Sequence, residues 1–405
     1  MKPLEGIRVL ELGTHVAVPV AARFMADWGA EVVKVESPTG DLWRMYGENI
    51  ACPTTEEENP IFCIPNSNKK LISVNMKSPE GMEVIHKLLE KTDVLVSNIR
   101  LKALRKLGLD YESLKERYPR LVYLHFTGYG YDGPLAAAPG FDAAAFWAMG
   151  SMMTEWAAEG APPITPSSAF GDAVVASSVL SGVLGGLLSR ERTGKGVFLT
   201  TSLYANALWY DFSDLIACQP QYGMRRPSVY GRTYNPFLNA YRCKDGRWVY
   251  IAALEFDRLY APCLEVLGMD EYIEKYRACT TREEKLELRG SLFPMCRDIF
   301  LTRSADEWVA AFAARDIVIQ KIAKAAELSQ SEQGWANGYL QKVEFPNGRT
   351  TVMPNTPIHF PGMETGKTCA VGAVGSDTRS VLADLGYTGE QIEHMVADGA
   401  VKAAE

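Results

Sequence analysis

Two carboxylates stand where a carboxyl group could act as a nucleophile, an acid or a base. Asp172 follows a glycine in the segment SAFGDAVVAS and opens a long run of small apolar residues. Asp142 has a similar setting in PGFDAAAFWAMG. Acids are favoured at helix starts by the helix dipole and the free N–H groups, so a structural role explains both residues. The apolar flanks of Asp172 also predict a buried helix end, where a carboxylate is costly unless it is used.

A second group of residues suited to chemistry is basic. Lys69 and Lys70 precede one predicted strand, and four basic residues follow another, namely Arg100, Lys102, Arg105 and Lys106. Strand edges of α/β proteins bind ligands, and clustered positive charge suits an anion with several phosphates, such as coenzyme A. A solvated helix face explains the same residues equally well.

The elements that must position these side chains alternate between strands and helices. β-Branched and leucine-rich runs predict strands over 7–12, 31–36, 71–76, 93–98 and 121–130. Helical patterns lie between them, including 19–29 and 79–92, and a further helix runs from Asp172 to Leu188. This alternation predicts an α/β fold with a parallel sheet covered on both faces. No G-x-G-x-x-G follows the first strand, which removes the main support for a nicotinamide oxidoreductase.

The pattern changes near residue 219. The Gly-, Pro- and Arg-rich stretch 219–237 predicts a linker or a long active-site loop. A β-hairpin is expected around Lys244-Asp245-Gly246, and Ser304 with Glu307 forms a capping-box pattern at a helix start. These signals predict a smaller α+β unit ending near Ala326, followed by two amphipathic helices in the tail.

Bulk properties narrow the functional classes. The 405 residues exceed one ordinary domain, and 47% hydrophobic with 22% charged residues is typical of a soluble globular protein. The net charge of −7 argues against nucleic acid or an anionic membrane as a partner, and no signal segment or bilayer-spanning apolar run is recognised. The eight cysteines and five histidines are dispersed, which favours reduced thiols in the cytoplasm over a metal site. G-x-S-x-G and P-loop motifs are absent.

Several segments occur in an order that resembles the class III CoA-transferase family. They are GIRVLELGTHVAVPVAARFMADWGAEVVKVESPTGDLWR, NSNKKLISVNMKSPEG, LHFTGYGYDGP, GFDAAAF, FGDAVVAS and the ending VLADLGYTGEQIEHM. The resemblance implies a large Rossmann-like domain built from both chain ends, a smaller domain, and an interlocked homodimer. The implied boundaries are 1–218 for the N-terminal part of the large domain, 219–326 for a linker and the small domain, and 327–405 for a linker and the C-terminal part of the large domain.

The resemblance also implies a mechanism and a set of binding residues. Asp172 matches the family's catalytic aspartate, which carries the acyl group and then CoA, so that CoA esters are substrates and no permanent cofactor or metal is expected. Val16 and Ala17 match the loop along the pantetheine arm, and Tyr129 matches a tyrosine near the thioester. Positions contacting the nucleotide and phosphates are matched by Lys69, Asn98, Ile99 and Lys106, with Arg100 and Arg105 added from the basic group.

Departures from the formyl-CoA:oxalate transferases concern the acceptor. Ser37 replaces an arginine, Thr127 replaces an active-site lysine, and YGRTYNPF (230–237) lacks a glycine-rich loop. These changes argue against oxalate. The chain resembles more closely the phenyllactate and 2-hydroxyisocaproate transferases of anaerobic amino-acid fermentation.

The predicted reaction is CoA transfer from an enoyl- or 2-hydroxyacyl-CoA to a 2-hydroxy acid. Bulky side chains before Asp172 favour an aromatic or branched aliphatic acid, namely Phe141, Phe146, Trp147, Met149, Met152, Met153 and Phe170. Alternatives are a carnitine-type transferase, a non-catalytic CoA-binding subunit, and an α-methylacyl-CoA racemase. The racemase lacks support because Phe141 stands where that enzyme has its catalytic histidine.

Overall fold

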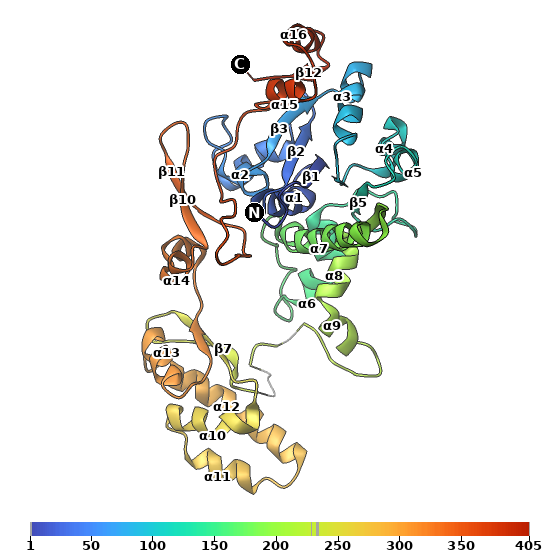
Figure 1. Ribbon diagram of the computed structural model, residues 1–405. Coiled ribbons are helices and arrows are strands. Elements are labelled where there is room, and N and C mark those ends of the chain that lie inside the picture. Colours follow the sequence, from blue (N-terminus) through green and yellow to red (C-terminus); the bar gives the residue numbers. More distant parts are fainter. Residues whose placement is uncertain (1, 228, 232–234, 405) are drawn as a thin grey trace. The chain divides into compact units, whose positions relative to one another are not determined.

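The chain forms two compact units. The computed structural model describes residues 2–227, 229–231 and 235–404 (Figure 1). The first unit comprises residues up to Met153, residues 164–224, and those from Ser329 onward; the second comprises residues 154–163 and 225–328. The boundaries predicted from the sequence lie at 218 and 326. The sequence did not predict that residues 154–163 belong to the second unit. Within the linker predicted over 219–237, positions 228 and 232–234 lie outside the described residues.

The first unit is built on a seven-stranded sheet of order β12-β3-β2-β1-β4-β5-β6. All neighbours are parallel except the short edge strand β12, which runs antiparallel to β3. The strands are β1 (Arg8–Leu12), β2 (Glu31–Glu36), β3 (Lys70–Val74), β4 (Val94–Ser97), β5 (Val122–Thr127), β6 (Val197–Ser202) and β12 (Val401–Lys402). The predicted parallel sheet is therefore confirmed, and the strand order reverses direction at β1.

Helices cover both faces of this sheet because neighbouring strand residues point to opposite sides. Val9 of β1 belongs to the core beneath α1 (Ala17–Asp27) and α7 (Phe170–Thr193). The adjacent Leu10 belongs to the opposite core, beneath α3 (Pro79–Leu89), α4 (Leu101–Leu107), α5 (Tyr111–Leu114), α15 (Thr378–Asp384) and α16 (Gly389–Ala397). Pro19 lies in the first turn of α1, where its missing N–H costs little, so the helix begins two residues earlier than expected.

The remaining elements of the first unit are short. They are the helical turns η1 (Leu42–Ile50) and η2 (Asp142–Ala148), the helices α2 (Pro60–Asn66), α8 (Leu203–Tyr210), α9 (Phe212–Ala217) and α14 (Glu332–Ala336), and the hairpin of β10 (Leu340–Glu344) with β11 (Thr350–Pro354). Helix α6 (Met152–Glu155) begins in the first unit and ends in the second. The segment η3 (Ala325–Gln330) lies at the boundary of the two units.

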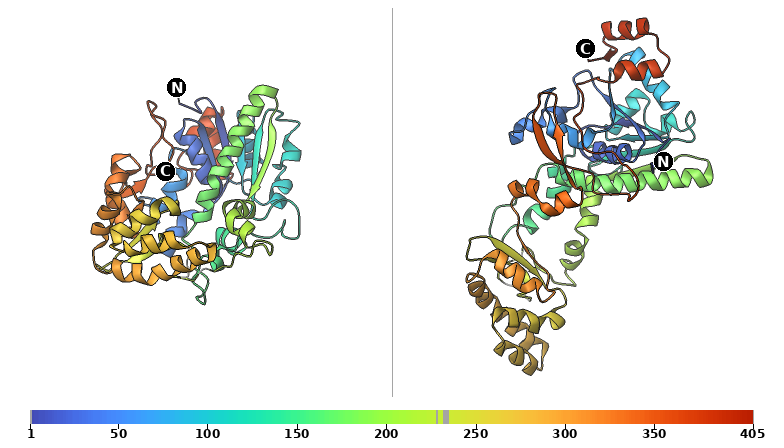
Figure 2. Two further views of the ribbon diagram at one scale, coloured as in Figure 1. Left: turned by 90° about the horizontal axis from the view of Figure 1, so that it is seen from below. Right: turned by 60° about the vertical axis from the view of Figure 1, so that its left-hand side comes forward.

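Helix α7 has an unusual composition. Among the described residues it is the one helix long and apolar enough to cross a membrane, which the sequence analysis did not anticipate. It packs against α1, β5 and β6, and Val175, Val179 and Val183 are fully buried in the core (Figure 2). A helix buried in the core of a protein can have the same length and the same apolar composition as a membrane-spanning helix.

The second unit is a small α+β body with its own core. Three antiparallel strands, β7 (Leu238–Arg242), β8 (Trp248–Ala252) and β9 (Ile319–Lys321), pack with α10 (Phe256–Leu267), α11 (Glu271–Ala278), α12 (Arg282–Phe300) and α13 (Ala305–Ala313). The predicted hairpin is confirmed, with Gly246 at φ +76° in its turn. The predicted capping box of Ser304 and Glu307 is also present.

Candidate active site

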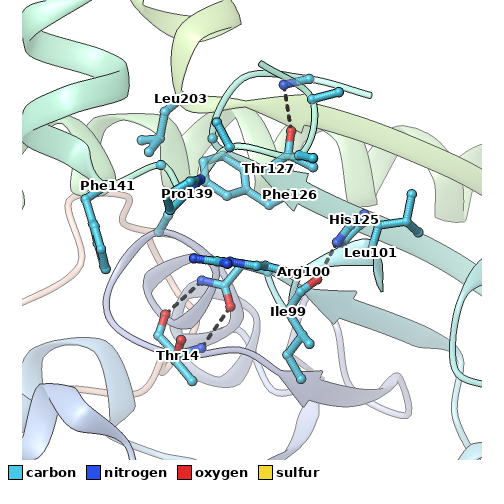
Figure 3. Close-up of a pocket in the computed structure, with 18 of the residues that line it drawn as sticks. Thr14, Ile99, Arg100, Leu101, His125, Phe126, Thr127, Pro139, Phe141 and Leu203 are labelled. Atoms are coloured by element: carbon cyan, nitrogen blue, oxygen red, sulfur yellow. Dashed lines mark hydrogen bonds between the residues drawn. The ribbon is translucent and has the colours of Figure 1, made fainter. Parts of the chain in front are cut away.

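A cavity of about 770 Å³ opens at the carboxyl ends of β1, β4 and β5. It is lined by residues 14–17, 98–102, 105, 125–128, 130, 131, 136–141, 172 and 203. Figure 3 shows side chains from these loops around the opening. The cavity lies where the strand order reverses at β1, which is the usual ligand site of an open parallel sheet.

Asp172 lies in the first turn of α7 and lines this cavity. Its side chain is half-buried. Burial, and secondly the charge of Asp142, raise the pKa of Asp172 to about 7. The sequence analysis expected an acid at the buried start of this helix, and the structure places it there with a free face toward the cavity.

Asp142 begins η2 and is buried against the same helix terminus. A Cβ added to Gly171 would lie 2.1 Å from Oδ1 of Asp142 and 2.6 Å from the Phe146 ring, so only glycine allows this approach. Burial raises the pKa of Asp142 to about 6, against the lowering effect of the backbone N–H groups of Gly171 and Asp172 and of the Trp147 indole. The sequence predicted a helix start here but gave no sign that the two acids meet.

The backbone before Asp172 is held in an uncommon conformation. Ala169 has φ +56°, a left-handed value that costs a non-glycine residue roughly 1 kcal/mol. The Tyr46 hydroxyl donates to Oγ of Ser168 at 2.7 Å, and α7 has no side-chain cap of its own. Tertiary contacts therefore fix this helix terminus, and such strain is common at functional sites.

The loop after β1 is clamped from two sides. Asn98 accepts from the N–H of Thr14 at 2.9 Å and donates to its carbonyl at 2.8 Å. The N–H of His15, which has φ +63°, donates to Oδ1 of Asp41 at 3.1 Å. Val16 and Ala17 follow at the start of α1 and line the cavity, as expected for the pantetheine loop. Asn98 and Ile99 also line it, although the Asn98 amide is engaged with the protein.

Lys69 does not line the cavity. Its ammonium group is buried and donates to Oε2 of Glu11 at 2.6 Å, to the Pro19 carbonyl at 2.8 Å and to Oδ1 of Asn66 at 3.1 Å. Burial lowers the pKa of Lys69 to about 8 despite the Glu11 carboxylate. These contacts make it a support for β1 and α1, and they do not favour the expected role in nucleotide binding.

The basic residues after β4 separate into two groups. Arg100, Lys102 and Arg105 line the cavity, whereas Lys106 is exposed on α4 away from it. Within the described part of the chain, none of the three lining residues forms an ion pair with a carboxylate. This leaves three positive charges available to an anionic ligand.

Aromatic residues complete the walls. Phe141 is 62% exposed and its ring meets the His15 ring edge-on at 5.5 Å, and both residues line the cavity. Of the bulky residues singled out from the sequence, only Phe141 does so among the described lining residues; Phe146, Trp147 and Met152 are core residues. Tyr129 packs against Gly140 and the core and does not line the cavity.

Two lining residues were not recognised from the sequence. His125 donates from Nε2 to the Ile99 carbonyl at 2.7 Å, and its Nδ1 accepts from the Tyr131 hydroxyl. Burial lowers the pKa of His125 and raises the pKa of Tyr131 to about 12, so both are neutral near pH 7. They join the loops after β4 and β5. Among the described residues no cluster of three His, Cys, Asp or Glu suited to a metal ion occurs.

The profile of CoA-transferase family III matches residues 4–378, and the chain belongs to that family. It is a CoA-transferase, an enzyme whose substrates are CoA thioesters.

Particular relatives refine the comparison. The chain is 35% identical to (R)-2-hydroxy-4-methylpentanoate CoA-transferase of Clostridioides difficile, over 96% of this chain and 97% of the relative. It is 34% identical to cinnamoyl-CoA:phenyllactate CoA-transferase of Clostridium sporogenes, over 97% and 96%. A solved CAIB/BAIF family protein from Brucella suis is similar at TM-score 0.77 and 26% identity, covering 95% of this chain and 99% of that one.

Proposed function

We propose that this enzyme moves CoA from an enoyl- or 2-hydroxyacyl-CoA to a free 2-hydroxy acid with an aromatic or branched side chain. The observation that supports it most is the position of Asp172, a carboxylate at a helix N-terminus facing a cavity with three unpaired basic residues. The two 2-hydroxy-acid transferases named above support the substrate class.

In the proposed mechanism Asp172 is the nucleophile. Its carboxylate oxygen attacks the thioester carbonyl, the carbon–sulfur bond breaks, and CoA thiolate leaves with formation of an acyl–aspartyl anhydride. The thiolate then attacks the aspartyl carbonyl, which releases the first acid as a carboxylate and leaves an aspartyl–CoA thioester. The incoming acid repeats these steps in reverse and restores the Asp172 carboxylate.

The start of α7 suits such steps because unpaired backbone N–H groups and the helix dipole stabilise an oxyanion. Val16, Ala17 and Ile99 offer apolar surface to the pantetheine arm, and Arg100, Lys102 and Arg105 offer charge to the phosphates. The thioester energy passes from acid to acid, so the chemistry consumes no additional reactant.

The residue at position 141 distinguishes the proposed enzyme from a racemase. Phe141 carries no titratable group, so the residue at the position of the racemase histidine supplies no base to the α-carbon. Its exposed ring, beside His15 and near Leu203, favours an aromatic or branched acyl chain.

Two further proposals concern the enzyme's setting. Exposed apolar side chains on α8 and α9 support a homodimer in which a second copy covers them, namely Trp209, Tyr210, Phe212, Leu215 and Ile216. A cytoplasmic location also stays a prediction.

An acceptor panel tests the substrate class. The enzyme is incubated with cinnamoyl-CoA or isocaprenoyl-CoA and, separately, phenyllactate, 2-hydroxy-4-methylpentanoate, oxalate, carnitine, succinate or glutarate. We expect new CoA esters of the two 2-hydroxy acids, identified by mass spectrometry, and little or none of the others. Transfer to oxalate or carnitine alone would show that the substrate class is wrong.

The three basic residues that line the cavity, Arg100, Lys102 and Arg105, give a second prediction. Arg105→Gln removes one of the charges proposed to meet the phosphates, so we expect the KM for the CoA ester to rise about five- to tenfold with kcat changed less than about twofold. The KM of the variant should also depend less on NaCl concentration. Arg192→Gln, at the exposed far end of α7, is the control and should match the wild type. An unchanged KM in Arg105→Gln would place the phosphates elsewhere.

A further inference from the structure

Two acids share the N-terminus of α7. Asp142 is buried with its Oδ1 against the backbone of Gly171, and Asp172 is the next residue along that backbone. The backbone N–H groups of Gly171 and Asp172 lower the pKa of Asp142, and the charge of Asp142 raises the pKa of Asp172. The dipole that would stabilise the nucleophile's charge is therefore shared with a second carboxylate.

No ion pair offsets the charge of these two acids in the described part of the chain. Among the described residues, neither acid forms an ion pair with a lysine, arginine or histidine. Arg23 of the neighbouring α1 bonds to Asp27, the Ile64 carbonyl and Thr368 instead.

Other titratable groups on the elements packed around this terminus include His15, Tyr46, Tyr129, Tyr204, Tyr210 and Asp211. The cavity that Asp172 faces is also lined by Arg100, Lys102, Arg105, His125 and Tyr131. Among the described residues, Asp142 is the one charged group that shifts the pKa of Asp172. Two like charges at a common buried site cannot both form at little cost, so ionisation of one acid raises the pKa of the other.

We propose that Asp142 is a positioning residue for the nucleophile: its buried carboxyl group packs against the start of α7 at Gly171, and its charge controls when Asp172 ionises. The inference rests on the proposed role of Asp172. A carboxylate that binds its proton more tightly is also a stronger nucleophile toward the thioester, provided the pH is high enough to remove that proton. Acylation of Asp172 removes its charge, and Asp142 is then free to ionise alone.

The test is the Asp142→Asn variant, which keeps the shape and removes the charge. Aspartate labelled with ¹³C at the side-chain carboxyl gives the titration midpoint of each acid by NMR, with Asp172→Asn identifying the Asp172 signal. We expect the Asp172 midpoint to fall by about one pH unit or more, yet to stay above that of an ordinary aspartate because the burial remains. Asp132→Asn, on the exposed loop after β5, is the matched control and should cause no shift.

Activity supplies the second readout. The initial burst of cinnamate released from cinnamoyl-CoA, as the aspartyl–CoA thioester forms, should decrease below about pH 7 in the wild type and persist to lower pH in Asp142→Asn. An unchanged Asp172 midpoint in Asp142→Asn would overturn the inference. If that variant does not fold, Asp172→Asn provides the reciprocal measurement, in which the Asp142 midpoint should fall; no fall there would overturn it equally. If the Asp172 midpoint falls as expected but no CoA ester gives a burst of free acid, the proposed function would be contradicted instead.

Discussion

Replacing Asp172 with asparagine is expected to reduce CoA transfer about 10³-fold or more. The amide has nearly the shape of the carboxyl group but cannot attack the thioester carbonyl, so neither the anhydride nor the aspartyl–CoA ester can form. Steady-state rates measure the loss, and hydroxylamine added with acyl-CoA alone reports the intermediate, since it converts acylated Asp172 to a hydroxamate detectable by peptide mass spectrometry. The wild type should carry this mark and Asp172→Asn should not.

Binding and folding controls separate chemistry from collapse of the site. The dissociation constant of the CoA ester should change only a few-fold, because Arg100, Lys102 and Arg105 lie on other loops. The fold should also be retained. Since burial raises the pKa of Asp172 from 3.8 to about 7 in the folded state, stability is lost as the pH rises between these two values, and the neutral amide avoids this loss. Thermal unfolding at pH 8 should therefore begin no lower than in the wild type. Normal transfer by Asp172→Asn would contradict the nucleophile assignment.

Much of the fold could be predicted because its causes are local. The strand over 31–36 matches β2 residue for residue, and the strand over 7–12 differs from β1 by one residue. Two-residue periodicity and the helical patterns between strands set the layers, as Val9 and Leu10 on opposite faces illustrate. Two features were missed: residues 154–163 belong to the second unit, and α1 begins at Ala17. Contacts between residues far apart in the sequence decide both.

The site was only partly predictable for a related reason. Val16, Ala17 and Arg105 line the cavity because they follow β1 and β4, whose ends meet at the edge of the sheet, whereas Asp172 lines it from the N-terminus of α7. The pairing of Asp142 with Asp172 depends instead on η2 folding back onto α7, and no local pattern encodes that contact. Sequence alone also could not separate the buried lysines, Lys34 and Lys69, from exposed ones such as Lys70, which directly follows Lys69.

One of those buried lysines, Lys34, supports the second large prediction. Its side chain is fully buried and donates to Oε1 of Glu11 at 2.9 Å and to the Gly13 carbonyl at 2.8 Å, and it pairs with Oδ2 of Asp41 at 2.9 Å. Burial alone lowers the pKa of Lys34, but the carboxylates of Asp41 and Glu11 outweigh it and raise the pKa above its usual range. The ammonium therefore stays charged and holds two acids beneath the loop after β1.

Lys34→Met keeps much of the side chain's length but leaves those two carboxylates without this partner in a dry interior. Breaking a buried pair in this way costs about 3–5 kcal/mol, so we expect the free energy of unfolding to fall by that amount in urea titrations at pH 7. The matched control is Lys70→Met on the neighbouring strand β3, whose ammonium is 38% exposed and pairs with exposed Glu31 and Asp384. That change should cost less than about 1 kcal/mol. Because Asp41 also holds the His15 N–H, the folded fraction of Lys34→Met should bind CoA esters more weakly. Equal stabilities of the two variants would show that the buried network contributes no more than a surface pair.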